Sequence, residues 1–178
     1  MPHPSTLSEI LAALESNAGA LTACFAAQPE AVLFTGDPDH WGPAHHLLHL
    51  TQTSRSITRG LRAERLPVHS TGVSRSYGEL IGAAGASLAA ASKERMLENG
   101  RGVILAPGTT RDALIDDYVQ ASVDLRAAAA QWKDEDLDRS TLPHAFVGDM
   151  TVREMLLFCV FHERHHLRLV RARLEPAS

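Results

Sequence analysis

Two histidines four residues apart, His162 and His166, could bind a metal ion together. If residues 151–174 form a helix, both rings project from one face, one turn apart, at the inner edge of an apolar stripe. Two imidazoles at such a position are costly to bury without partners. A divalent metal ion would satisfy both rings at once. Hydrogen bonds to core or boundary groups would serve as well, so the pair alone leaves both interpretations open.

A metal centre needs more than two protein ligands, and a second group of histidines supplies candidates. His45, His46 and His49 lie close together in another predicted helix. Three imidazoles with the remaining positions left to water form the arrangement of catalytic sites, whereas structural zinc sites are closed, usually by cysteines. The two cysteines, Cys24 and Cys159, lie in apolar helical segments without CxxC spacing. The composition therefore favours an open, histidine-based site.

The segment HERHH at residues 162–166 also matches the H-E-x-x-H motif of zinc proteases, in which the glutamate activates metal-bound water. The extended form of that motif has glycine and histidine where Leu169 and Ala172 stand here. A protease is therefore disfavoured. Glu163 keeps two interpretations, a base beside metal-bound water or an ordinary solvated helix residue.

Capping boxes, and apolar residues at helical spacing, predict the helices that must position these side chains. Thr6 with Glu9 and Thr151 with Glu154 are two such boxes. The predicted helices cover residues 6–27, 42–62, 77–97, 110–132 and 151–174. No convincing strand alternation is present. We therefore expect an all-α protein, a four-helix bundle with one additional packed helix, in a single domain over residues 1–178.

The sequence predicts the structure of three segments less definitely. The helix predicted over 77–97 is rich in alanine and glycine, so close backbone packing should offset the cost of its glycines. The connection 63–76 is long for a helical hairpin and either crosses the bundle or shapes the rim of a site. The apolar segment 103–106 is a short loop or an isolated strand.

The bulk composition limits the classes of partner. Net charge is −4 and no lysine-rich block occurs, so nothing indicates a nucleic acid partner. There is no basic-then-apolar leader and no apolar run of 18 residues, so we expect a cytoplasmic protein without a membrane partner. The small-residue helix has a surface suited to two-fold packing, which predicts a homodimer. The alternative is that this helix packs only within its own bundle.

The order of the motifs resembles the DinB/YfiT-like superfamily over roughly residues 5–174. The residues that carry the resemblance are Trp41-Gly-Pro-Ala-His-His-Leu-Leu-His49-Leu, then Pro143-His144-Ala145-Phe146-x-Gly148, then Thr151-x-x-Glu154 and His162-x-x-x-His166. The nearest branch is the DinB-like domain, whose linker often reads His-Pro before the glycine. Ala145 replaces that proline here.

The resemblance implies a four-helix bundle with a three-histidine divalent metal site, commonly in a dimer. By match to the motif, His49 is the first ligand, and His162 and His166 are the second and third. His45 or His46 could replace His49, because both lie on its side of the helix. Imidazole ligands favour zinc or nickel over magnesium or calcium. The remaining histidines have ordinary interpretations too: His165 is expected to be solvated, and His144 makes a loop hydrogen bond or lies at the rim of the site.

The resemblance also suggests an activity. Characterised relatives include bacillithiol transferases and a mycothiol-dependent maleylpyruvate isomerase, and others are described as metal-dependent hydrolases. We therefore expect a thiol-dependent S-transferase with a small-molecule substrate and bacillithiol or mycothiol as co-substrate. Neither cysteine of the chain looks catalytic, so the nucleophile would come from the co-substrate. One alternative is a hydrolase in which Glu163 or His144 moves protons. The other is a non-catalytic, stress-related binding protein.

Overall fold

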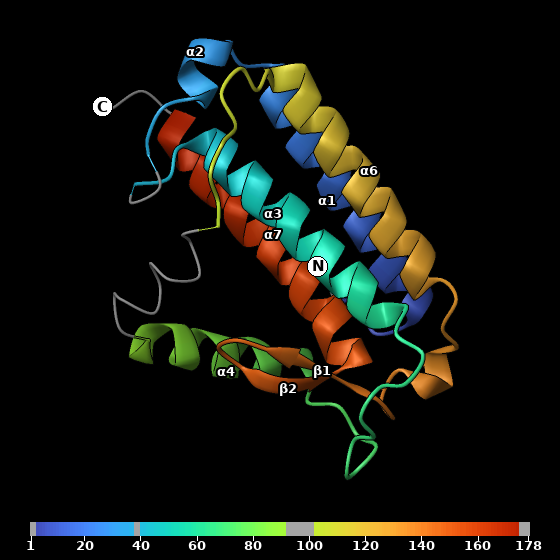
Figure 1. Cartoon of the computed structure of the whole chain (residues 1–178). Helices are drawn as coiled ribbons and strands as arrows, with labels where there is room; N and C mark the ends of the chain where they lie inside the picture. The colour runs from blue at the N-terminus through green and yellow to red at the C-terminus, as the bar shows by residue number, and fades with distance from the viewer. Residues whose placement is uncertain (1–2, 38–39, 92–101, 175–178) are drawn as a thin grey trace.

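Four long helices lie side by side in the computed structural model, which describes residues 3–37, 40–91 and 102–174 (Figure 1). They are α1 (Leu7–Ala26), α3 (Pro43–Leu61), α6 (Arg111–Ala129) and α7 (Val152–Leu174). Helices α1 and α3 each pack against both α6 and α7. The all-α prediction is confirmed, and the predicted bounds of these helices agree to within a few residues.

Three shorter helical segments complete the helical structure of the described residues. They are α2 (Glu30–Leu33), α4 (Tyr77–Ala90) and the 3-10 turn η1 (Asp134–Asp136). Two clusters of buried apolar side chains fill the bundle, one including Ile10, Leu156 and Val160, the other including Leu47, Tyr118 and Val170. Both cysteines are free thiols, Cys159 buried and Cys24 half-buried. No helix among the described residues is long and apolar enough to span a membrane.

The capping boxes predicted for α1 and α7 are both present. In α7 the amide of Glu154 donates to the Thr151 hydroxyl, and the amide of Thr151 donates to the Glu154 carboxylate, each over 3.1 Å. In α1 the pair Thr6 and Glu9 makes the same two bonds, at 3.3 and 3.1 Å. Each box satisfies amide groups that the first helical turn leaves without partners. The start of α7, and with it the position of its histidines, is therefore fixed by local sequence.

The start of α3 is fixed by a close backbone approach. A Cβ atom on Gly42 would lie 1.7 Å from the carbonyl oxygen of Thr35, so a residue with a side chain cannot occupy this position without a shift. Pro43 follows at the first helical position, where its fixed φ suits a helix start. The Gly42 amide donates to Nδ1 of His45 over 3.3 Å, which turns the His45 ring back toward the helix start.

The segment before α7 contains a β-hairpin that the sequence pattern did not predict. Strands β1 (Thr141–His144) and β2 (Gly148–Thr151) pair antiparallel, with Thr141 opposite Thr151 and His144 opposite Gly148. Each strand has only four residues, and Pro143 interrupts the first, so no alternation is visible in the sequence. Gly148 adopts a φ of +79°, which favours glycine at the start of the returning strand.

Helix α4 lies across the end of the bundle where α7 begins (Figure 1). Its predicted continuation to residue 97 lies outside the described residues. The expected close packing of its glycines is wrong for Gly78, Gly82 and Gly85. Apart from the backbone of the helix itself, no described atom lies within 4 Å of the position that a Cβ would take. Their cost in the helix is therefore not offset by contacts within the described chain.

The long connection 63–76 runs alongside the segment that leads into the hairpin and does not cross the bundle. The amide of Thr141 donates to the Pro67 carbonyl, and the amide of His69 donates to the Arg139 carbonyl, each over 2.8 Å. Near the end of the connection, Arg75 makes a bidentate ion pair with Glu154 of α7, with N–O distances of 2.8 and 2.9 Å. The segment 103–106 is a loop, as one of the two expectations had it.

Candidate metal centre

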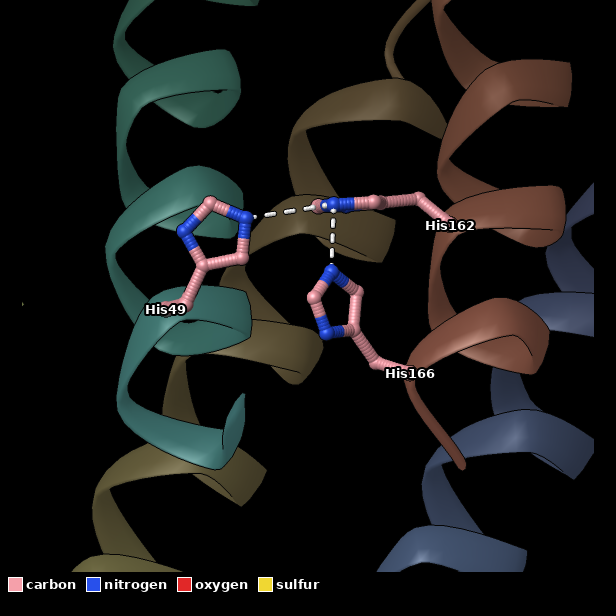
Figure 2. A group of neighbouring side chains, drawn as sticks. All are labelled: His49, His162 and His166. Atoms are coloured by element: carbon pink, nitrogen blue, oxygen red, sulfur yellow. Dashed lines mark hydrogen bonds between the residues drawn. The ribbon is translucent and has the colours of Figure 1, made fainter. Parts of the chain in front are cut away.

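Three histidine rings converge between α3 and α7 (Figure 2). Nε2 of His162 lies 3.2 Å from Nε2 of His49 and 2.9 Å from Nε2 of His166. One ring nitrogen from each of the three residues lies within 4.8 Å of the others. These are the residues that the family resemblance implied as ligands, and α3 supplies one while α7 supplies two. Among the described residues they form a group that could hold a divalent metal ion.

The spacing of the ring nitrogens can be compared with that of metal ligands. Zinc–imidazole bonds are about 2.0–2.1 Å long, so two nitrogens on one ion lie about 2.9 Å apart at a right angle and about 3.4 Å apart at a tetrahedral angle. The two distances to His162 Nε2, 2.9 and 3.2 Å, fall within that range. With the third pair of nitrogens, of His49 and His166, within 4.8 Å, the three residues could hold a divalent ion. All-imidazole ligation suits zinc or nickel better than magnesium or calcium.

The rings are held in the neutral form that binds a metal ion. Burial lowers the pKa of His49 to about 4. Burial is also the largest cause of the lowered pKa of His162 and of His166, and the neighbouring histidines lower both further. A neutral imidazole keeps a lone pair on one ring nitrogen, which a metal ion requires. Metal binding at neutral pH would therefore not have to displace a proton from a charged ring.

His46 touches this group from outside. Its Nδ1 lies 2.8 Å from Nδ1 of His166, on the nitrogen that faces away from His162. His46 is buried, and its Nε2 has no hydrogen-bond partner in the described part of the chain. The sequence had left His45 and His46 as replacements for His49. In the structure His45 accepts from the Gly42 amide instead, and neither ring belongs to the three-histidine group.

Aromatic side chains cover the group on two sides. The ring of Trp41 lies 5.0 Å from that of His49, measured between centroids, and Phe158 stacks on His162 at 5.4 Å. From the sequence, Trp41 was named only as the first residue of a motif, and its contact with the histidines was not predicted. The available signal was its place directly before Gly42-Pro43, at the start of the helix that carries His49. These rings provide apolar walls around the nitrogens.

Glu163 is buried, so its interpretation as a solvated helix residue is wrong. Its side chain is 3% exposed, and one carboxylate oxygen accepts a hydrogen bond from the Tyr118 hydroxyl over 3.0 Å. Burial raises the pKa of Glu163 to about 7. The residue next to His162 turns about 100° away on a helix, toward α6 in this case. Glu163 is not part of the three-histidine group.

His144 lies in strand β1 and takes the ordinary role expected for it. Its Nδ1 accepts hydrogen bonds from the amides of Phe146 and Val147, over 3.3 and 3.2 Å, and so closes the hairpin turn. Its ring meets Phe158 at a centroid distance of 4.7 Å, and Phe158 in turn stacks on His162. His144 is therefore linked to the histidine group through Phe158 and does not belong to it.

His165 was expected to be solvated and is half-buried in the structure. Its ring stacks on Phe161 with centroids 5.8 Å apart, and Arg168 lies 3.2 Å from its Nδ1. Its ring lies edge-on to that of His166 with centroids 5.5 Å apart, but no nitrogen of His165 belongs to the three-histidine group. The HERHH segment therefore divides its side chains between two sides of α7, with His162 and His166 toward α3.

The comparisons with known proteins agree with the fold and with the motifs. The sequence model of the DinB superfamily matches residues 6–170, which includes all four long helices nearly to their ends and the three histidines. A search of curated proteins and a search of solved structures each found no match. The match to the family model covers most of the chain, and the chain therefore belongs to the DinB superfamily.

Proposed function

We propose that the protein is a metal-dependent S-transferase that joins a low-molecular-weight thiol to an electrophilic small molecule. The observation that supports this proposal is the convergence of three neutral imidazoles at nitrogen distances of 2.9 and 3.2 Å. His49, His162 and His166 would hold the ion, which we propose to be zinc or nickel. When bound, such an ion lowers the pKa of a coordinated thiol and holds it as the reactive thiolate.

The surrounding residues support thiol chemistry that takes its nucleophile from outside the chain. Cys159 is buried in the core, and burial raises the pKa of its thiol, so it is a poor nucleophile. The rings of Trp41 and Phe158 provide apolar surface beside His49 and His162. In the overall reaction, R–SH and R′–X give R–S–R′ and H–X. A sulfur–carbon bond forms, the carbon–X bond breaks, and X leaves with its electron pair.

The alternatives have less support from the site. A hydrolase was expected to use Glu163 or His144 as its proton carrier. The Glu163 carboxylate is bound by Tyr118 on the α6 side, and Nδ1 of His144 is bound by two turn amides. Neither contact directs these groups toward the three histidines. The hydrolase and the non-catalytic binding protein would use the same three histidines, but none of these contacts gives either of them a further residue at the site.

To test this proposal, the protein is loaded with zinc or nickel. It is then given a thiol (bacillithiol, mycothiol or glutathione) together with a monochlorobimane-type electrophile. Thiol-dependent turnover should be lost in His166→Ala and kept in His165→Ala. His165 is a matched control because it lies on the same helix but outside the three-histidine group. A panel of esters and amides is offered separately without thiol. Turnover there would support a hydrolase. Bound metal with no turnover in either assay would support the non-catalytic role.

Three further expectations accompany the proposal. We propose a single domain over residues 1–178, a cytoplasmic location and a homodimer with a thiol and a small molecule as its ligands. The dimer is the most accessible of these to measurement. The glycines of α4 leave a surface without contacts in the described chain, and small residues allow two backbones to approach closely.

A further inference from the structure

We propose that His46 is a positioning residue for the metal centre: it accepts the Nδ1 proton of His166 and so directs Nε2 of that ligand toward the metal ion. The inference rests on the proposed metal site. His46 is on α3, one turn before His49, and its Nδ1 lies 2.8 Å from Nδ1 of His166. The two ring centroids are 5.0 Å apart.

The direction of this hydrogen bond follows from counting protons. A neutral imidazole carries one N–H group and one lone pair. Nε2 of His166 lies 2.9 Å from Nε2 of His162 and is the nitrogen that belongs to the converging group. Its lone pair is needed for the metal ion, so the single proton of His166 must be on Nδ1. Since that nitrogen faces His46 Nδ1, His46 must accept there.

The tautomer of His46 follows in turn. If Nδ1 of His46 accepts, its own proton is on Nε2. In the structure Nε2 of His46 is buried and has no hydrogen-bond partner in the residues described. In the metal-free protein the His46–His166 bond can run in either direction, because a proton on either Nδ1 completes it. Metal binding therefore selects one of two tautomer pairs without any change in net charge.

A direct ligand role for His46 does not fit the same geometry. Nδ1 and Nε2 lie on different edges of the His166 ring, and His46 contacts the edge that faces away from His162. His46 also meets Trp41 nearly at a right angle, at 5.5 Å between centroids. Its place is therefore behind the ligand, where a hydrogen-bond acceptor fixes the orientation of a metal-binding imidazole and raises its basicity.

The test compares zinc affinity in two variants of His46. His46→Asn places an amide oxygen near the position of Nδ1 and can still accept from His166. His46→Phe keeps a ring of similar size but has no acceptor. Loss of such an acceptor commonly costs about 10–100-fold in metal affinity. We therefore expect the zinc Kd of His46→Phe, from chelator competition, to rise by about that factor. His46→Asn should stay within roughly threefold of wild type, because the acceptor is retained.

A second measurement uses the wild-type protein and does not depend on how the variants fold. Long-range ¹H–¹⁵N NMR correlations of the zinc form should show His166 protonated at Nδ1 and His46 protonated at Nε2. Zinc affinity of His46→Phe equal to wild type, with melting in EDTA showing an intact fold, would overturn the inference. So would His46 protonated at Nδ1 in the zinc form. Absence of zinc binding by the wild type would instead refute the metal site itself.

Discussion

Glu163→Gln is expected to change how the stability of the protein depends on pH. Burial raises the pKa of Glu163 in the folded protein to about 7 from an ordinary value of 4.5. Between these values the folded protein holds a proton that the unfolded chain has released. The free energy of unfolding of the wild type therefore falls as pH rises through this window, and the penalty is fully present above about pH 8. Below pH 4.5 both states are protonated and the penalty vanishes.

The size of the effect follows from the difference in pKa. Each pKa unit corresponds to about 1.4 kcal/mol, so the full penalty is about 3 kcal/mol above pH 8 and the change between pH 5.5 and pH 8 is about 2 kcal/mol. Glutamine has no such titration and can still accept from the Tyr118 hydroxyl. The stability of Glu163→Gln relative to wild type should therefore increase by about 2 kcal/mol over that interval.

Urea unfolding in EDTA, followed by circular dichroism at several pH values, measures this difference. The buried histidines titrate in both proteins, so their contribution largely cancels when the variant is compared with wild type. Glu135→Gln, at an exposed position, controls for the loss of one negative charge. A stability difference for Glu163→Gln that stays constant from pH 5.5 to pH 8 would refute the reasoning, because the carboxyl would then not be held protonated by burial.

Three further outcomes are expected. Arg75→Ala should lower the free energy of unfolding by about 2 kcal/mol in urea titrations, because it leaves the buried Glu154 carboxylate with only its backbone partners; an unchanged unfolding midpoint would contradict this. Trp132→Phe keeps Trp41, whose ring lies 5.0 Å from that of His49, so nickel should quench its tryptophan fluorescence. Nickel should leave the fluorescence of Trp41→Phe nearly unchanged, and equal quenching in the two variants would place the ion elsewhere. Light scattering should give about twice the chain mass of 19.3 kDa at micromolar concentration, and a value near 19.3 kDa would exclude a stable dimer.

Much of the fold was predictable because its signals are local. The two capping boxes and the helix-period stripes fix where α1 and α7 begin, and both boxes have the expected bonds. The four-residue spacing of His162 and His166 determines that they share a face of α7. The pairing of that face with His49 came from the family resemblance, since spacing alone left three histidines of α3 open.

The parts that could not be predicted depend on contacts between distant segments. The hairpin has four-residue strands, too short for an alternation to show, and its pairing needs the turn amides that His144 accepts. Glu163 looked like an exposed residue because its partner, Tyr118, is 45 positions away on α6. The role of His46 depends on the direction of one ring nitrogen toward His166, which no spacing rule contains.

The central claim is that His49, His162 and His166 bind a divalent metal ion together. Elemental analysis of protein purified without an affinity tag tests it most directly, with wild type measured beside His162→Ala. His162 is the informative choice because its Nε2 lies next to both other ligand nitrogens, at 3.2 and 2.9 Å. We expect about one equivalent of zinc or nickel in the wild type and a large loss in the variant, since removing one of three ligands opens the site. Equal metal content in the two proteins would contradict the account.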